Sequence, residues 1–324
     1  MTSIQHISQP VSVEMDLCRQ RFDSFMTHNN VLLNEVLQRV ASRKGKMMRP
    51  LLTLLSAKLL GEIGENTLLA ALTFEFFHTA SLIHDDIVDE SAVRRGEASV
   101  NRAYDNKVAV LVGDFILANA LDTASSVKHS ELVAILSKTA KLLADGELLQ
   151  LHNIQNQELS EEVYFHIIKG KTAALFAACA EAGALSVTDN KTDIERLQNF
   201  GEIVGTCFQI RDDIFDYVSG SEIGKPTGND LREGKATLPL IHALNVTNDA
   251  QMLHLVHMVK EGRADHDTIS TLVNFAVNSG GIEYAEQQMK RIAQQAHDLL
   301  DTYPDSPTRQ ALHNYIDYVI TRSH

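Results

Sequence analysis

The stretch that decides the fold is residues 67–88, TLLAALTFEFFHTASLIHDDIV, which an aspartate follows at position 89. Its apolar residues recur at spacings of three and four, the period of an α-helix. They leave hardly any face polar, which is typical of a helix at the centre of a large bundle. Near its end stand Asp85 and Asp86, and Asp89 follows it directly. Residues 67–88 therefore predict a buried central helix with carboxylates at its C-terminal end.

The acidic pattern occurs a second time, at Asp212, Asp213 and Asp216, again within an apolar helical segment. Because positions i and i+4 share one face of a helix, the first and last acid of each cluster can point at one spot. We interpret the two faces as opposite walls of a cavity. A few carboxylates that leave coordination positions free suit Mg²⁺ bound to a phosphorylated substrate. The alternative, two acidic surfaces in solvent, would also expose the apolar neighbours of both clusters.

Bulk composition narrows the class of protein. The 324 residues are 44% hydrophobic and 22% charged, which allows one large globular domain over residues 1–324. A net charge of -13 argues against nucleic acid as a partner and against a broadly basic membrane face. Neither a secretory signal nor a run of 18 apolar residues is found, so we expect no transmembrane segment. Three cysteines without metal-ligand spacing predict reduced thiols in a cytoplasmic protein.

Helical periodicity predicts an almost entirely α-helical chain. The expected helices are 51–60, 67–88, 108–124, 131–151, 161–185, 194–218, 238–244, 268–278, 282–300 and 306–320. Asn66 and Ser160 are candidate N-caps, and Gly61 and Gly220 follow helical runs. The connection 219–237 is long for a compact bundle, and loops of that length are commonly functional.

Four separate basic sets accompany the acidic clusters. Arg94 and Arg95 follow the first cluster, and guanidinium groups match phosphate oxygens well. The other sets are Lys46 with Arg49, Lys169 with Lys171 and the adjoining Thr172, and Lys225 with Lys235. Any one set alone would be an ordinary surface feature. Together with two acidic clusters they predict two phosphate-bearing ligands, one bound through metal and one bound directly.

Two uncharged polar residues share the faces of the acids. His78 lies two helical turns before Asp85, and Gln209 lies three residues before Asp212. Each alone is more often a satisfied core residue than a ligand. The fourteen His show no zinc spacing, and neither a Ser, His and Asp order nor a Gly-rich nucleotide loop is found.

These residues resemble the trans-isoprenyl diphosphate synthases, the polyprenyl synthetase family, in order from Gly45 to about Ala243. Residue 47 departs from the pattern, because it is Met where many members have a basic residue. The elements are Gly45, Lys46, Arg49 and Pro50; His78; His84, Asp85, Asp86 and Asp89; Arg94, Arg95 and Gly96; Gly113 and Asp114; Gly146, Glu147 and Gln150; Lys171 and Thr172; Phe208, Gln209, Asp212, Asp213 and Asp216; Gly224, Lys225, Gly228 and Asp230; and Glu233, Gly234 and Lys235.

The resemblance implies an all-α isoprenoid synthase fold of antiparallel helices around a deep central cavity, usually in a homodimer. It implies three magnesium ions held by Asp85, Asp89 and Asp212 with Asp216 nearby, and catalytic roles for these acids and Lys171. An allylic diphosphate would also contact Arg94, Lys171, Thr172, Gln209, Lys225 and Lys235. Isopentenyl diphosphate would be held without metal by Lys46, Arg49, His78 and Arg95.

The helix before Asp85 is the expected wall of the hydrocarbon tunnel. One helical turn of about 5.4 Å is comparable to one isoprene unit, so residues one and two turns before Asp85 control product length. Ala80 and Ser81 are small, so we expect the tail to pass them, whereas Phe76 or Phe77 one turn deeper could stop growth. We therefore expect a long-chain synthase of octaprenyl type that supplies quinone side chains.

Three other functions are weighed against this one. Geranylgeranyl or farnesyl diphosphate synthesis is the alternative within the family. A terpene cyclase shares the fold, but its second metal motif typically contains Asn, Ser and Glu. A non-catalytic helical partner subunit would lack acids and bases that are all present in this chain.

Overall fold

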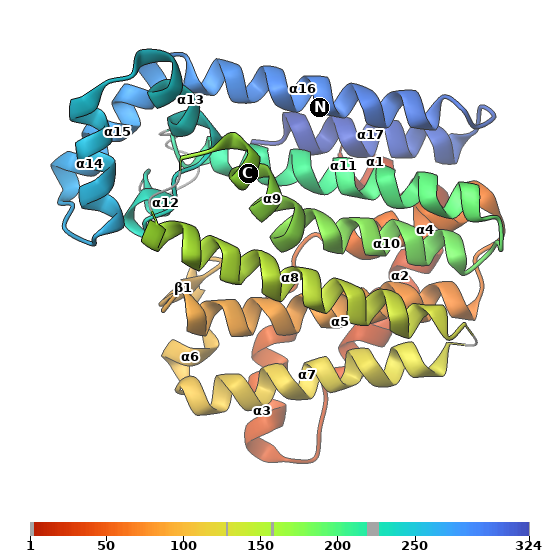
Figure 1. The fold of residues 1–324 in the computed structure, drawn as a ribbon. Coiled ribbons are helices and arrows are strands. Elements are labelled where there is room, and N and C mark those ends of the chain that lie inside the picture. The colour runs from red at the N-terminus through yellow and green to blue at the C-terminus, as the bar shows by residue number, and fades with distance from the viewer. Residues whose placement is uncertain (1–2, 128, 157–158, 219–226, 324) are drawn as a thin grey trace.

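The computed structural model describes residues 3–127, 129–156, 159–218 and 227–323. Within these ranges it is a bundle of long helices with one two-residue hairpin, which confirms the all-α prediction (Figure 1). The elements are α1 (Ile4–Ile7), η1 (Gln9–Val11), α2 (Ser12–Phe25), α3 (Val31–Ala41), α4 (Met48–Leu60), α5 (Glu65–Val88), β1 (Val93–Arg94), β2 (Glu97–Ala98), α6 (Val100–Ala103), α7 (Asn106–Ser126), α8 (Glu131–Asn156), α9 (Glu161–Ile168), η2 (Lys169–Ala173), α10 (Ala174–Leu185), α11 (Lys191–Phe215), α12 (Asn229–Arg232), α13 (Leu238–Thr247), α14 (Ala250–Lys260), α15 (His266–Asn278), α16 (Gly281–Leu300) and α17 (Pro307–Thr321).

Helix α5 is the central helix that residues 67–88 predict. It packs against α7 along its length and also against α4, α10 and α2. Phe74 and Phe76 are fully buried on it, together with most of its small and aliphatic residues. The C-terminal ends of α5 and α11 lie at the same end of the bundle, where α12 to α15 gather (left in Figure 1). Both acidic clusters are thereby brought to one end of the molecule.

Some expected boundaries were wrong. Helix α5 begins at Glu65 with Gly64 as its N-cap, so Asn66 lies inside the helix. The expected helix 161–185 is interrupted by η2, a π-helical turn between α9 and α10. Helix α11 ends at Phe215, three residues earlier than expected. By contrast, the Ser160 hydroxyl caps α9 by accepting from the Val163 amide, as predicted.

The sequence did not predict the helices before residue 48 or helix α14. Each of these helices buries three side chains or fewer, so its apolar face is narrow and its helical period is weak in the sequence. The short hairpin β1–β2 was also missed. It turns at Arg95 and Gly96, both with positive φ (52° and 80°), which matches the turn geometry favoured in two-residue hairpins.

Helix α7 is the most apolar of the long described helices by the length and composition test for a membrane span. Among the described residues it is long and apolar enough to cross a membrane by composition, and 39% of its most apolar 18 residues are buried. Core helices of globular proteins pass the same test, and α7 packs along α5. Cys18, Cys179 and Cys207 are all free and buried, as expected for reduced thiols.

Candidate active site

Three acids from the two clusters face one cavity of about 660 Å³. Asp85 reaches it from α5, Asp89 from the residue that caps the C-terminus of α5, and Asp212 from α11. The remaining wall is mixed. The polar residues that line it are Arg49, His78, Ser81, His84, Arg94, Glu147, Lys171, Thr172 and Gln209; the apolar ones include Phe77, Ala80, Leu117, Leu143, Leu175 and Phe208. The cavity wall therefore contains both acids that the spacing pairs in the first cluster, but only Asp212 of the pair in the second.

The middle acid of each cluster points away and has its own partner. Asp86 is buried, and its Oδ1 accepts from Arg94 Nε at 2.8 Å. Asp213 is buried too, and it accepts from the Tyr164 hydroxyl at 2.6 Å and from Gln209 Nε2 at 2.8 Å. Burial raises the pKa of Asp213 to about 7 despite these two hydrogen bonds. Both middle acids are thus engaged in holding other site residues.

Burial disfavours the charged form of Asp85 in the cavity wall. Burial raises the pKa of Asp85 to about 6, and the nearby Lys171 opposes that rise. A buried carboxylate with a raised pKa gains stability when a cation approaches it. The site is therefore electrostatically suited to receive positive charge.

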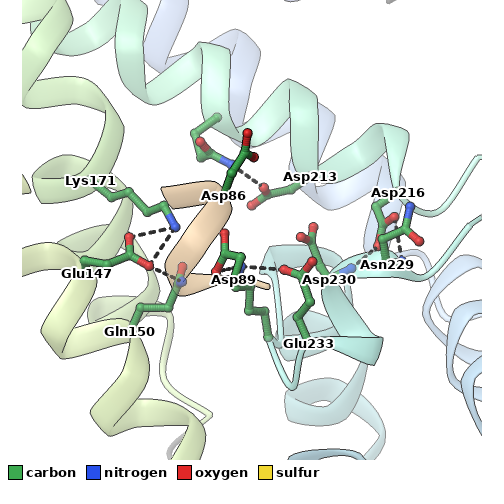
Figure 2. Close-up of polar contacts among 12 residues, drawn as sticks. Asp86, Asp89, Glu147, Gln150, Lys171, Asp213, Asp216, Asn229, Asp230 and Glu233 are labelled. Atoms are coloured by element: carbon green, nitrogen blue, oxygen red, sulfur yellow. Dashed lines mark hydrogen bonds and ion pairs between the residues drawn. The ribbon is translucent and has the colours of Figure 1, made fainter. Parts of the chain in front are cut away.

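Lys171 is delivered by the π-helical turn η2. Its ammonium nitrogen lies 2.7 Å from Glu147 Oε2 on α8, and Gln150 donates to the same carboxylate at 3.2 Å (Figure 2). The approach of the two elements requires glycine, because a Cβ at Gly146 would stand 2.7 Å from the Lys171 amide nitrogen. Glu147 is one of the residues that carry the family resemblance, but the resemblance assigned it no role. The structure shows that it fixes the position of Lys171.

Thr172 and Gln209 form a second link across the same helices. The Thr172 hydroxyl donates to Gln209 Oε1 at 2.7 Å, and Gln209 continues to Asp213. A chain of hydrogen bonds thus joins η2 to the second acidic cluster. It orients the amide that sequence analysis placed near the allylic diphosphate.

The end of the connection 219–237 returns to the first cluster. Lys235 Nζ lies 3.4 Å from Asp89 Oδ1 and 2.5 Å from Glu233. Lys225, the other lysine predicted here, lies outside the described residues. Asp216, expected among the metal ligands, accepts backbone hydrogen bonds from Asn229 and Asp230 at 2.8 and 2.9 Å (Figure 2). It is not among the residues that line the cavity containing Asp85.

A second cavity of about 510 Å³ adjoins the first, and five Lys and Arg side chains contribute to its lining. Its charged and polar lining comprises Lys46, Arg49, Glu75, His78, Arg94, Arg95, Tyr318 and Arg322. This set contains all four residues expected to bind a diphosphate without metal. Burial, and then the charges of the arginines, lower the pKa of His78, so its imidazole is neutral.

The glycine at position 45 has a steric reason. A Cβ there would stand 2.7 Å from the guanidinium of Arg95, which crosses the Gly45 backbone and donates to the Arg43 carbonyl. Arg95 itself has φ 52°, since it sits in the hairpin turn. Gly45 and Arg95, which belong to two separate motifs of the sequence, therefore meet in one close contact.

Arg322 is a site residue that sequence reasoning missed. It lies near the C-terminus, its guanidinium is 2.6 Å from Asp212 Oδ1, and it lies over the ring of Phe208 at 4.0 Å. No motif surrounds it, and 110 residues separate it from Asp212. Only the packing of α17 against α11 brings the two together.

The expected chain-length residues lie in the cavity wall. Phe77, Ala80 and Ser81 line it on the α5 side. Phe76 does not, because its ring is buried against Phe22 and Phe25 from α2 at 5.2 Å each. Of the two phenylalanines considered, Phe77 is the one that can contact a hydrocarbon tail.

The acids fit magnesium better than a preformed metal cage. Among the described residues there is no group of three or more His, Cys, Asp or Glu side chains close enough to hold a metal alone. Magnesium keeps several waters and binds through one or two carboxylates together with substrate phosphates. Asp85, Asp89 and Asp212, spread around one cavity, offer that kind of donor set.

Comparison with known proteins gives a consistent result. The model of the family described as polyprenyl synthetase matches residues 30–276. The octaprenyl diphosphate synthase of Haemophilus influenzae is 35% identical over 313 residues, which are 96% of this chain and 95% of that protein. The crystal structure of a geranylgeranyl pyrophosphate synthase from Bacteroides thetaiotaomicron is 44% identical, with a TM-score of 0.88, and covers 99% of this chain and 100% of its own. A polyprenyl synthase from Caulobacter crescentus, complexed with calcium and isoprenyl diphosphate, has a TM-score of 0.93 at 30% identity and covers 100% of this chain and 99% of its own.

Proposed function

The chain belongs to the polyprenyl synthetase family and has its all-α isoprenoid synthase fold, and from this premise we propose a specific reaction. The protein condenses an allylic diphosphate with successive isopentenyl diphosphate units and releases diphosphate at each step. The product is a long-chain all-trans polyprenyl diphosphate of octaprenyl type, used for quinone side chains. The observation that carries the proposal is the pair of adjoining cavities, one with three facing carboxylates and one lined by cations.

Each cavity receives one diphosphate. The allylic diphosphate lies in the carboxylate cavity, with magnesium held by Asp85, Asp89 and Asp212 and with Lys171, Arg94 and Lys235 beside it. Isopentenyl diphosphate lies in the second cavity against Lys46, Arg49 and Arg95. When bound, magnesium neutralises negative charge on the leaving diphosphate.

The protein's own cations do the rest of the electrostatic work. Ionisation of the allylic diphosphate leaves a carbocation and a diphosphate anion, so fixed positive charge on the departing oxygens lowers the barrier. Lys171, pre-positioned by Glu147, is placed for this role. The isopentenyl double bond then attacks the cation, and the released diphosphate takes the proton. His78 is neutral in the second cavity and is not needed as a base.

Product length decides between the main proposal and its alternative. The small Ala80 and Ser81 support passage of a long tail, and the Haemophilus influenzae relative is named an octaprenyl diphosphate synthase. Phe77 in the cavity wall and the 44% identity to a geranylgeranyl pyrophosphate synthase favour the shorter product as the second candidate.

The test is direct. The purified protein is incubated with farnesyl diphosphate, isopentenyl diphosphate and Mg²⁺, and the dephosphorylated products are sized by chromatography. A dominant product of about eight isoprene units supports the proposal, and a dominant geranylgeranyl product replaces it with the alternative. Hydrocarbon formed without isopentenyl diphosphate would indicate a cyclase, and absence of turnover would indicate a non-catalytic subunit.

We also propose a cytoplasmic homodimer in which residues 1–324 form one domain. Buried free cysteines fit a reducing compartment. Val110, Leu111 and Leu121 on α7 are 41%, 68% and 51% exposed, which is unusual for one helix and suits a covered face. Light scattering coupled to size-exclusion chromatography tests the dimer, and Leu111→Glu should shift it toward monomer.

A further inference from the structure

Asp216 makes three hydrogen bonds to one turn of backbone. Its Oδ1 accepts from the Asn229 amide at 2.8 Å, and its Oδ2 accepts from the Asp230 amide at 2.9 Å. Its main-chain carbonyl accepts from the Gly228 amide, also at 2.8 Å. Asp216, the residue that caps the C-terminus of α11, therefore holds the start of α12 in place (Figure 2).

The turn held by Asp216 carries Lys235. The Lys235 amide donates to the Asp230 carbonyl at 2.8 Å, which closes the turn around α12. Two glycines with positive φ, Gly228 at 77° and Gly234 at 79°, make that path possible. The Lys235 ammonium then lies between Glu233 and Asp89. Displacing the start of α12 would move this cation relative to the first acidic cluster.

A metal-ligand role for Asp216 fits these contacts poorly. Both carboxylate oxygens already accept from amides at good distances, and charge-assisted bonds of this kind are about twice as strong as neutral ones. Asp216 is also absent from the cavity wall that holds Asp85, Asp89 and Asp212. A carboxylate committed to two amides would lose both if it turned toward the cavity.

We propose that Asp216 is a positioning residue for prenyl transfer: it fastens α12 to the end of α11 and thereby sets Lys235 beside Asp89. The proposal rests on the proposed function for its kinetic consequence, but its structural consequence does not. Asp216 acts through the backbone of Asn229 and Asp230, and Asp212 is the ligand that its cluster supplies to the metal.

Hydrogen exchange on the substrate-free full-length protein tests the structural part. Loss of a charge-assisted hydrogen bond should speed exchange of the Asn229 and Asp230 amides by about tenfold in Asp216→Ala. Asp216→Asn keeps one acceptor and should give an intermediate rate. Unchanged exchange of these amides in Asp216→Ala would overturn the proposal.

Binding of Mn²⁺, followed by electron paramagnetic resonance, separates positioning from ligation. We expect the Mn²⁺ midpoint of Asp216→Asn to stay within about twofold of wild type, whereas removing a ligand charge in Asp212→Asn should weaken binding by about tenfold or more. Equal weakening in both variants would show that Asp216 is a ligand and refute the proposal.

Kinetics then show whether the effect passes through Lys235. If it does, Asp216→Asn and Lys235→Ala should each lower kcat by about tenfold, and the double variant should be no slower than Lys235→Ala alone. Multiplicative losses in the double variant would refute the link. If wild type makes no prenyl product, the proposed function fails while the exchange and Mn²⁺ results still stand.

A second variant guards against misfolding of the Asp216 variants. Gly228→Ala leaves the Asp216 carboxylate intact but disturbs the same turn, because its Cβ would stand 2.6 Å from Ile269 and φ is 77°. It should speed exchange at Asn229 and Asp230 and lower kcat as Asp216→Asn does. A Gly228→Ala protein with faster exchange but full kcat would overturn the idea that this turn positions Lys235.

Discussion

Blocking the α5 wall of the cavity with Ser81→Phe should shorten the product. Ser81 lies four residues before Asp85 on a continuous helix, a rise of about 6 Å. A phenyl ring at that depth leaves room for about one isoprene unit beyond the carboxylate, because one unit is comparable to one turn of about 5.4 Å. The expected product is therefore shorter than that of wild type.

The deeper residue sets the length that wild type can reach if it forms a floor. Phe77 lies eight residues before Asp85, about 12 Å along the helix, which corresponds to about one further unit than Ser81 allows. If Phe77 is only a side wall, the wild-type product is long and Phe77→Ala leaves it unchanged. If Phe77 is the floor, the wild-type product is short and Phe77→Ala lengthens it.

The assay compares product lengths of wild type, Ser81→Phe, Phe77→Ala and Ser81→Ala under identical substrate ratios. Ser81→Ala is the matched control, since it removes only the hydroxyl that donates to the His78 carbonyl within the helix. Its products should match wild type. Long products from an active Ser81→Phe enzyme would refute the reasoning that the tail runs along α5.

Three further perturbations test other parts of the site. Glu147→Gln should lower kcat by about tenfold or more at unchanged thermal stability, because the ammonium that faces it at 2.7 Å loses a charged partner; an unchanged kcat would contradict that role. Since burial raises the pKa of Asp85 to about 6, this carboxyl becomes protonated as pH falls through that value, and the Mg²⁺ concentration for half-maximal activity should rise about tenfold between pH ~7 and pH ~5. A flat Mg²⁺ requirement over that range would argue against Asp85 as a ligand. Gly113→Ala should destabilise the fold by about 1–3 kcal/mol in thermal unfolding, because its Cβ would stand 2.3 Å from His84, whereas Gly64→Ala, with open space around it, should change stability far less.

Features with local periodicity could be predicted from the sequence. The i and i+4 spacing paired Asp85 with Asp89, and both lie in the cavity wall; of the second pair only Asp212 does. Continuous apolar periodicity identified α5 as central, because burial on all sides leaves a signal in every turn. Asp216 satisfies the same spacing, yet its carboxylate accepts from the Asn229 and Asp230 amides of a turn that returns to α11, a contact that spacing does not encode.

Contacts made through turns or across distant helices could not be predicted in this way. The pairing of Arg94 with Asp86 depends on the hairpin at Arg95, which no apolar pattern marks. The ion pair of Arg322 with Asp212 depends on how α17 docks on α11. Such contacts are set by tertiary packing, so residue type and local spacing contain little information about them.

The two cavities have opposite electrostatic needs although they share residues. Burial raises the pKa of Asp85 in the first, whereas burial lowers the pKa of Arg49, which lines both cavities. In each case the charged form is the one that burial penalises, so a ligand of opposite charge would restore it.

The Asp212–Arg322 pair lies where the cavities meet and partly cancels both charges in the ligand-free protein. Magnesium that binds Asp212 must compete with this guanidinium, and Arg322 released from Asp212 adds positive charge to the cavity for isopentenyl diphosphate. Filling of the metal site should therefore strengthen binding of the second diphosphate, a coupling that Arg322→Ala would weaken when isopentenyl diphosphate affinity is measured with and without Mg²⁺. Equal coupling in wild type and Arg322→Ala would show that this guanidinium does not connect the two sites.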